Sequence, residues 1–275
     1  MCKFFSLISD GNGKACYFDA KLRADVKQGL IKVESPDSHT SIADYYGFKG
    51  SKEDTVNKWE YNPITRVLTE DNIAVDNDKF FVEKVCQELD FKEIIPQLNI
   101  KKIINPFIDR KALKVTKKDL HLLKEWDSVS DSVRDSVMYS VRDSVWDSVR
   151  DSVWDSVGDS VWDSVGDSVW DSVWYSVWDS VRDSVWYSVM YSVGDSVRDS
   201  VWYSVRDSVR DSARNFVGAY IGSFFDIDYK INLTSSNKLW DKGLVPSFDG
   251  ALWRLHGKNG KIIYTITQEK LRAMK

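Results

Sequence analysis

The sequence predicts an α+β protein whose flanking segments surround a central tetrapeptide-repeat β-solenoid, with a long α-helical rod as the alternative for the repeats. Three observations predict this class. The tetrad Asp-Ser-Val-x recurs from Asp127 to about Ser212 almost without interruption. The flanks carry both hairpin signals and helical spacings of apolar residues. The chain has 275 residues, 43% of them hydrophobic, which is enough for a substantial core.

A β-hairpin is predicted near each end of the chain. In the first, strands at residues 3–9 and 15–18 flank the turn Asp-Gly-Asn-Gly. In the second, strands at residues 251–255 and 261–267 flank His-Gly-Lys-Asn-Gly. Asp-Gly and Asn-Gly between apolar runs are strong hairpin signals, because these residues adopt positive φ angles readily.

Four helices are predicted in the flanks from caps and apolar spacing. Ser, Thr and Asp side chains accept hydrogen bonds from the first backbone N–H groups of a helix, and glycine commonly ends one. Thr116 with Asp119 forms the pair typical of a capping box. The predicted helices are a segment capped by Asp37 or Ser38 that runs through Tyr46, residues 79–89, the segment after Thr116, and residues 268–275.

These elements predict four regions along the chain. Residues 1–115 form an N-terminal α+β domain, and residues 116–126 form a helix that leads into the repeats. Residues 127–225 are the array with a hydrophobic end cap. Residues 226–275 form a C-terminal hairpin segment that is too small to be stable alone and can pack on the N-terminal domain.

Two positions of the tetrad are constant and two vary. Between Asp127 and Asp211 the first position is Asp 17 times and Tyr five times, the second is Ser, and the third is Val. Between Ser130 and Arg210 the fourth position holds eight Trp, seven Arg, three Gly, two Met and one Ser. Because the variable positions tolerate both bulk and charge, we expect them to face solvent.

Geometry favours the solenoid over the helix for this period. An α-helix turns by about 100° per residue, so a four-residue stripe drifts by about 40° per repeat and has no constant buried face. Asp, Ser, Val and Trp also disfavour helix by roughly 0.5–0.7 kcal/mol each relative to Ala. In a solenoid each tetrad would form one side of a coil and the Val side chains would stack in one core. The adjacency of Ser and Val opposes the solenoid, because adjacent strand residues point to opposite faces.

The array ends in an apolar segment. Its last tetrads carry aromatic residues at the serine positions, namely Phe216, Tyr220 and Phe224. This segment fits an amphipathic helix, and it fits equally well a hydrophobic cap that closes the end of a solenoid.

Charge divides the chain into an acidic middle and basic flanks. Residues 127–212 hold 17 Asp and 7 Arg, a net charge of −10, which leaves +6 for the remainder of a chain whose total is −4. Direct binding of nucleic acid by the acidic array is therefore not expected. The sequence shows neither a signal peptide nor the roughly 20 apolar residues of a membrane span, so we expect a cytoplasmic protein without a membrane partner.

One catalytic hypothesis starts at Cys2. After removal of the initiator methionine, the new N-terminal amine could act as the base for the Cys2 thiol, as in N-terminal nucleophile hydrolases. Asp37 and His39 would supply further polar groups. His121 and His256 fall on a helix and a turn, where we expect surface positions. The three cysteines form neither a CxxC pair nor a Cys/His cluster, so we predict no metal and no cofactor.

The preferred function is a non-enzymatic repeat protein that presents a Trp, Arg, Asp and Tyr surface to a protein partner. Trp, Tyr and Arg dominate the binding energy of many protein interfaces. Two further alternatives are an acidic mimic of DNA that inhibits a nucleic-acid-binding protein, and a passive spacer between the flanks. The predicted binding residues are fourth-position side chains: Trp146, Trp154, Trp162, Trp170, Trp174, Trp178, Trp186, Trp202, Arg134, Arg142, Arg150 and Arg182.

Segments of both flanks resemble uncharacterised phage and gut-metagenome proteins that also carry Ser-Val tetrapeptide arrays. These segments are Met-Cys-Lys-Phe-Phe-Ser at residues 1–6, residues 36–47, and Pro-Ser-Phe-Asp-Gly at residues 246–250. The resemblance covers most of the chain and implies a mobile-element origin, but no activity. The array also resembles pentapeptide-repeat proteins in architecture, which implies stacked coils.

Overall fold

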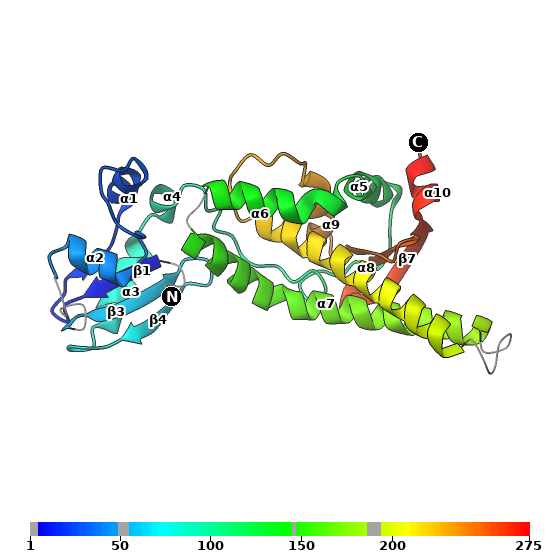
Figure 1. The fold of residues 1–275 in the computed structure, drawn as a ribbon, viewed down its shortest axis with the longest axis horizontal. Helices are drawn as coiled ribbons and strands as arrows, with labels where there is room; N and C mark the ends of the chain where they lie inside the picture. The colour runs from blue at the N-terminus through cyan, green and yellow to red at the C-terminus, as the bar shows by residue number, and fades with distance from the viewer. Residues whose placement is uncertain (1–4, 49–54, 145–146, 186–193) are drawn as a thin grey trace. The chain divides into compact units, whose positions relative to one another are not determined.

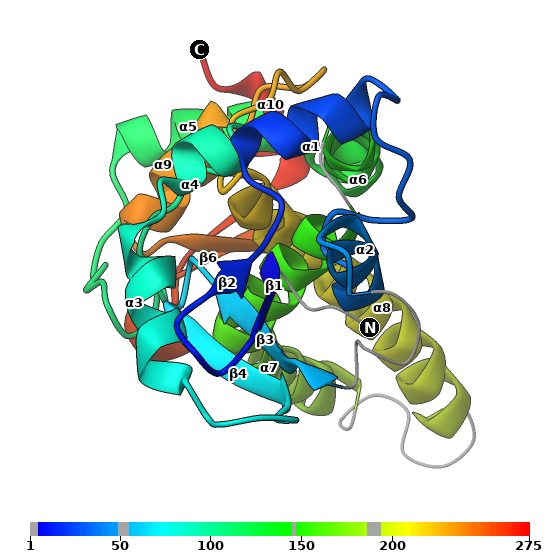
Figure 2. The same cartoon turned by 90° about the vertical axis from the view of Figure 1, so that its left-hand side faces the viewer.

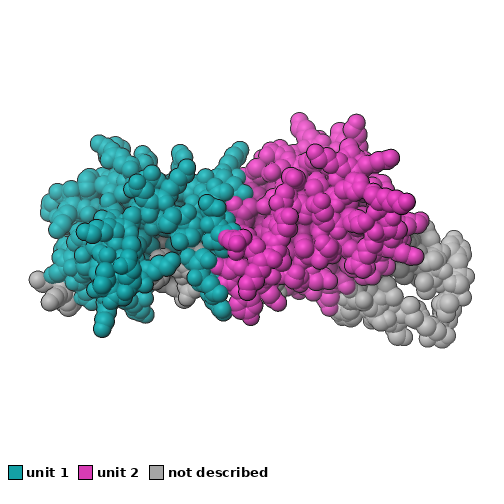
Figure 3. Space-filling model, turned by 90° about the horizontal axis from the view of Figure 1, so that it is seen from above, with its two compact units in different colours: residues 1–102, 141–156, 224–227 teal, residues 103–140, 157–223, 228–275 magenta. Residues whose placement is uncertain are grey.

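The computed structural model describes residues 5–48, 55–144, 147–185 and 194–275, without the side chains of residues 134, 147–148, 163, 174, 176–185 and 194–206. The chain divides into two compact units, which Figure 3 colours separately. Unit 1 comprises residues 1–102, 141–156 and 224–227, and unit 2 comprises residues 103–140, 157–223 and 228–275. Both units therefore combine flanking sequence with part of the array.

Unit 1 is built on a four-stranded antiparallel sheet with the strand order β2-β1-β3-β4 (Figure 1). Every residue of β1 is buried, so both faces of the sheet are covered at this strand, and Figure 2 shows the sheet between α2 and α3. The strands are β1 (Phe5–Ser9), β2 (Ala15–Cys16), β3 (Asn57–Asn62) and β4 (Val67–Asn72). The helices of the flank are α1 (Ala20–Lys27), α2 (His39–Tyr45), α3 (Lys79–Glu88) and α4 (Phe91–Ile94).

Unit 2 contains a three-stranded antiparallel sheet in the order β5-β6-β7. Its core is aromatic: Trp126, Phe216 and Trp240 are fully buried, and the Tyr220 ring stacks on Trp240 at a centroid distance of 4.0 Å. The flanks contribute β5 (Val245–Phe248), β6 (Leu252–His256), β7 (Ile262–Thr267), α5 (Lys117–Asp127), α9 (Thr234–Asp241), α10 (Gln268–Ala273) and the short 3-10 turn η3 (Lys258–Gly260). The start of the array contributes a second 3-10 turn, η2 (Ser130–Ser132).

The structure confirms the local predictions for the flanks. β1 pairs with β2 and β6 pairs with β7, as the two hairpin signals predict. Ser38, rather than Asp37, caps α2 by accepting a hydrogen bond from the backbone N–H of Ser41. Both hydrogen bonds of the capping box between Thr116 and Asp119 are present at the start of α5. These signals succeed because they depend on residues within a few positions of one another.

The array is helical, and the predicted β-solenoid is wrong. Its described residues form α6 (Val133–Ser144), α7 (Asp147–Val185) and α8 (Gly194–Gly222), which are separate helices where the alternative prediction had one rod. On a helix, neighbouring Ser and Val lie only about 100° apart and can both turn inward, whereas a strand would point them to opposite faces.

Two positions of the tetrad show a nearly constant burial over the described part of the array, namely the Val and, after Asp127, the first residue. The eleven described Val side chains from Val133 onward in the repeats are 0–1% exposed. From Asp131 onward, every first-position residue with a described side chain is exposed, whether it is Asp or Tyr. The buried Val of one tetrad contributes roughly 1.5–3 kcal/mol, which is comparable to the propensity cost of its four residues.

The row of Val side chains rotates by about 40° per tetrad around α7, and it stays buried because different segments of the chain pack against successive tetrads. In unit 1, Asn62 donates a hydrogen bond to the Ser156 hydroxyl at 2.5 Å. In unit 2, Asn105 donates to the Ser164 hydroxyl at 2.9 Å, and Ser172 donates to the Gly260 carbonyl at 2.5 Å. A helix with this period has no constant buried face against one packing partner, but here successive repeats pack against different segments of the chain.

The apolar end of the array belongs to α8 and enters the core of unit 2. Phe216 and Tyr220 occupy serine positions of the tetrad and pack against Trp126 and Trp240. Of the two alternatives predicted for this segment, the amphipathic helix is therefore confirmed, and the cap on a solenoid is wrong. None of the described helices is long and apolar enough to cross a lipid bilayer.

The first Asp of the array differs from the later ones. Asp127 is buried and accepts hydrogen bonds from Trp253 at 2.8 Å, Gln268 at 2.7 Å and Arg272 at 2.6 Å. Burial alone would raise the pKa of Asp127, but these three donors outweigh it and hold the pKa below its ordinary value. Asp127 thus joins the end of α5 to β6 and α10.

Replacing Asp127 should destabilise the protein far more than replacing an exposed Asp at the same tetrad position. Asp127→Ala leaves the buried Trp253 N–H without an acceptor, and we expect the free energy of unfolding to fall by about 2–4 kcal/mol. Asp159→Ala, at an exposed position of α7, should change it by less than about 0.5 kcal/mol. Urea denaturation measures both values, and equal effects of the two substitutions would contradict the assignment.

Candidate functional site

Five of the twelve predicted binding residues have described side chains. Trp154, Trp162 and Trp170 on α7 are half-buried, as is Arg150, while Arg142 on α6 is exposed. The expectation that the fourth position faces solvent is therefore wrong for these tryptophans, because this position lies next to the buried Val around the helix. The other seven residues lie outside the described residues and side chains: Trp146, Trp174, Trp178, Trp186, Trp202, Arg134 and Arg182.

Two of the tryptophans line a groove between α7 and α8 in unit 2. The groove has a volume of about 310 Å³. Trp162, Gly166 and Trp170 follow one another at four-residue spacing on α7, and all three line the groove. The opposite wall comes from α8, where Val209, Arg210 and Ala213 line the groove. Ala213 replaces the Val that the tetrad pattern would place there, which removes two methyl groups from this wall.

The Trp162 ring is held in position from two sides. A Cβ atom at Gly166 would lie 3.7 Å from ring atoms of Trp162, so the ring rests alongside the glycine backbone. The Arg214 guanidinium lies 5.7 Å from the centroid of the same ring, within cation–π range. An indole that is already fixed loses little conformational entropy when a ligand covers it.

The chemistry of this groove favours recognition over catalysis. Its walls are aromatic and aliphatic, and two exposed groups of opposite charge, Asp167 and Arg210, border it. Such a combination binds an apolar group and orients it by charge. Among the described residues, no group of three or more His, Cys, Asp or Glu side chains is placed to hold a metal ion.

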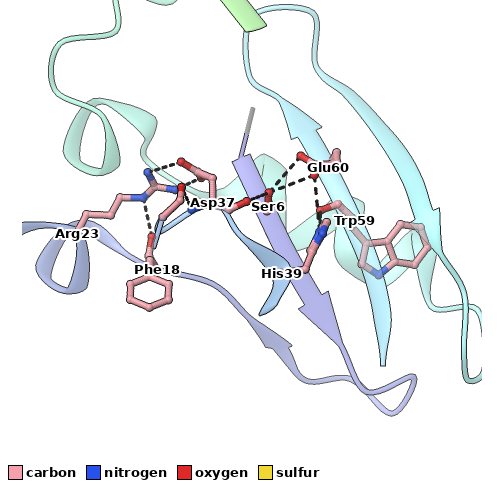
Figure 4. A network of polar contacts seen from close by, with 8 residues as sticks. Ser6, Phe18, Arg23, Asp37, His39, Trp59 and Glu60 are labelled. Carbon is pink, nitrogen blue, oxygen red and sulfur yellow. Dashed lines mark hydrogen bonds and ion pairs between the residues drawn. The ribbon is translucent and has the colours of Figure 1, made fainter. Parts of the chain in front are cut away.

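Two of the three catalytic candidates lie in a buried polar network of unit 1 (Figure 4). Asp37 forms an ion pair with Arg23, and its backbone carbonyl accepts a hydrogen bond from the Ser6 hydroxyl at 2.6 Å. Both Glu60 carboxylate oxygens also lie 3.2 Å from this hydroxyl. Because a hydroxyl has one proton, the shorter bond makes the Asp37 carbonyl its main acceptor, and the longer contacts make Glu60 the weaker one. Cys2 lies outside the described residues.

His39 is the second of these candidates, and it connects α2 to the sheet. Its Nε2 lies 3.0 Å from the Trp59 carbonyl and 3.8 Å from Glu60 Oε1, and its Nδ1 lies 3.5 Å from Asp71 Oδ2. The side chains of His39 and Glu60 are only 7% and 9% exposed. Their contacts run to the backbone and to neighbouring strands, so we assign His39 and Glu60 a structural role, which is to hold α2 on the sheet.

Sequence reasoning missed Arg23, the cation of this network. The helix that carries it, α1, begins after Asp19, whose side chain accepts a hydrogen bond from the Leu22 N–H. This cap is a local signal that could have identified α1. The partnership of Arg23 with Asp37 has no such signal, because it depends on how the segment between them folds back.

A second buried pair lies in unit 2. The Ser247 hydroxyl lies 2.8 Å from His256 Nε2, and His256 Nδ1 lies 2.9 Å from the Gly260 carbonyl. The carbonyl can only accept, so Nδ1 carries the proton and Nε2 accepts from the serine. This arrangement resembles an activated serine, but both side chains are fully buried and a substrate cannot reach them. The surface position predicted for His256 is wrong, because its ring fills the space between β5, β6 and the turn at Gly260.

Nothing in three comparisons, with protein-family models, curated proteins and solved structures, matches this chain. The resemblance of the flanks to phage and gut-metagenome proteins therefore stays a prediction.

The buried His256 should make the protein sensitive to acid. Burial lowers the pKa of His256 from 6.5 to about 4. Between these values the unfolded chain binds a proton that the folded chain excludes, so the free energy of unfolding should fall by about 3 kcal/mol as the pH drops through this window. In His256→Gln this contribution should disappear from the difference between urea denaturation at pH 7 and near pH 4.

His121→Gln is the matched control, because His121 is exposed on α5. It should retain the wild-type difference between the two pH values. A His256→Gln protein that loses as much stability in acid as the wild type would contradict the assignment.

Proposed function

We propose that this chain is a non-enzymatic, cytoplasmic binding protein that recognises a protein partner through the groove between α7 and α8. The observation that carries the proposal is the pair of half-buried tryptophans, Trp162 and Trp170, separated by Gly166 and faced by Arg210. Trp and Arg are the residues most enriched at the energetic centres of protein interfaces.

The size of the groove indicates how a partner would engage it. A volume of about 310 Å³ lies at the lower end of the range typical of small-molecule sites and suits one or two side chains. A protruding apolar or aromatic side chain of the partner would enter beside Gly166. Arg210 and Asp167 would then pair with charges around it. The array thus supplies both the aromatic anchors and the charged border from one repeated unit.

Substitution of the groove tryptophans should weaken partner binding. We expect the double variant Trp162→Ala/Trp170→Ala to raise the dissociation constant at least 30-fold, which corresponds to about 2 kcal/mol at an interface centre. The partner is first captured from lysate of the native host with the wild-type chain, then purified, and its affinity is measured by calorimetry.

Trp154→Ala provides the matched control, because Trp154 occupies the same tetrad position on α7 but does not line the groove. Its affinity should stay within twofold of the wild type. Gly166→Trp, which places a residue common at this tetrad position into the groove, should block binding. Full affinity in the double variant would reject the groove as the binding site and favour the spacer.

A second candidate, an acidic mimic of DNA, is favoured by the exposed first position. Successive first-position residues on a helix are separated by a rise of about 6 Å and a right-handed rotation of about 40°. Phosphates of a B-DNA strand also follow a right-handed spiral, at roughly 35° per step. The exposed carboxylates with described surroundings are Asp131, Asp135, Asp143, Asp151, Asp155, Asp159, Asp167, Asp171, Asp207 and Asp211.

If this candidate holds, the chain should displace a fluorescent DNA duplex from histone H1, a basic DNA-binding protein. Displacement should weaken steeply between 50 and 200 mM salt, because it depends on paired charges. Replacing five exposed carboxylates of α7 by amides, at Asp151, Asp155, Asp159, Asp167 and Asp171, should remove it. Failure of the wild-type chain to displace the duplex at 50 mM salt would reject the mimic.

A further inference from the structure

Unit 1 contains a cleft that the proposed binding function does not use. It has a volume of about 560 Å³, within the range of small-molecule sites, and lies among α1, α4 with the segment that follows it, and the end of α6. Its lining combines apolar side chains, such as Ala24 and Ile94, with the cationic groups of Arg23, Lys27 and Arg142.

Arg23 is the most constrained of these cations. Its side chain is 4% exposed, yet it contributes to the lining of the cleft. Its Nε donates to the Phe18 carbonyl at 2.9 Å, and each terminal nitrogen donates to one oxygen of the Asp37 carboxylate. These bonds use three of the five N–H groups of a guanidinium, so one N–H on each terminal nitrogen remains for a ligand.

The buried network behind Arg23 fixes its orientation. Asp37 is fully buried, and its own backbone carbonyl is held by Ser6 on β1 (Figure 4). Removing two charges from water is costly, so a buried ion pair by itself adds little stability. A guanidinium that is fixed before a ligand arrives, however, loses little entropy when it binds an anion.

The remaining side chains define the kind of ligand. Lys27 lies one helical turn after Arg23 on α1, so both cations can approach the same anionic group. Ile94 offers an apolar surface next to them. The carboxylates of Glu93 and Asp143 also line the cleft, which disfavours a ligand that carries many negative charges.

We propose that this cleft binds a small organic acid, with its carboxylate or phosphate group on Arg23 and Lys27 and its apolar body against Ile94. The two possible head groups share the same chemistry, because the oxygens of either one can accept a remaining N–H of Arg23 and pair with the ammonium group of Lys27. The site is independent of the groove between α7 and α8.

Calorimetry on the full chain at low salt tests the proposal with four probes: hexanoate, hexyl phosphate, 1-hexanol and inorganic phosphate. At least one of the two acids should bind saturably, and which one binds identifies the head group. Hexanol, which lacks the charge, and inorganic phosphate, which lacks the apolar body, should each bind at least tenfold more weakly. If neither acid binds saturably, or if hexanol binds as well as the acids, the proposal is overturned.

Variants on α1 avoid the buried ion pair and keep the test independent of folding. Lys27→Gln should weaken binding of the acid at least fivefold, and Ala24→Trp should abolish it by filling the cleft. Lys21→Gln removes an exposed charge from the same helix at a position that does not line the cleft, and it should leave binding unchanged. Equal losses in Lys21→Gln and Lys27→Gln, or full binding by Ala24→Trp, would show that the cleft is not the site.

Discussion

Burial of the valine stripe is the constraint on which the rest of the structure depends. The Val side chains of α6, α7 and the end of α8 that are described are all excluded from solvent, although their stripe rotates by about 40° per tetrad. Once Val is turned inward, helix geometry places Ser and the fourth residue on either side of it and the first residue outside. The exposed Asp, the hydrogen-bonding Ser and the half-buried Trp all follow from this one orientation.

Identical residues of the array perform different tasks because their surroundings differ. Asp127 is a buried acceptor of three hydrogen bonds, while Asp159 at the same tetrad position is exposed. Ser164 accepts a hydrogen bond from Asn105, while Ser172 donates one to the Gly260 carbonyl. A repeat can therefore build an irregular protein when the flanks provide a different partner for each turn of the helix.

The buried polar groups of the two units have separate consequences. In unit 2, Ser247 and His256 satisfy each other inside the core, where burial keeps the imidazole neutral. In unit 1, the ion pair of Arg23 and Asp37 reaches the lining of an open cleft. The first arrangement completes a core. The second places a fixed cation where a ligand can reach it, whereas the serine–histidine pair is closed off from solvent.

The sequence by itself determined the elements whose signals are local: both hairpins, the Ser38 cap of α2 and the capping box of α5. Each involves residues close in the chain, so the same physical contacts are available before the protein folds. Only the tertiary structure decided that the array is helical, that His256 is buried and that Arg23 meets Asp37. A four-residue period is poor for a helix in isolation, and packing against successive partners reverses that preference, because burial of Val in each tetrad offsets the propensity cost of its residues.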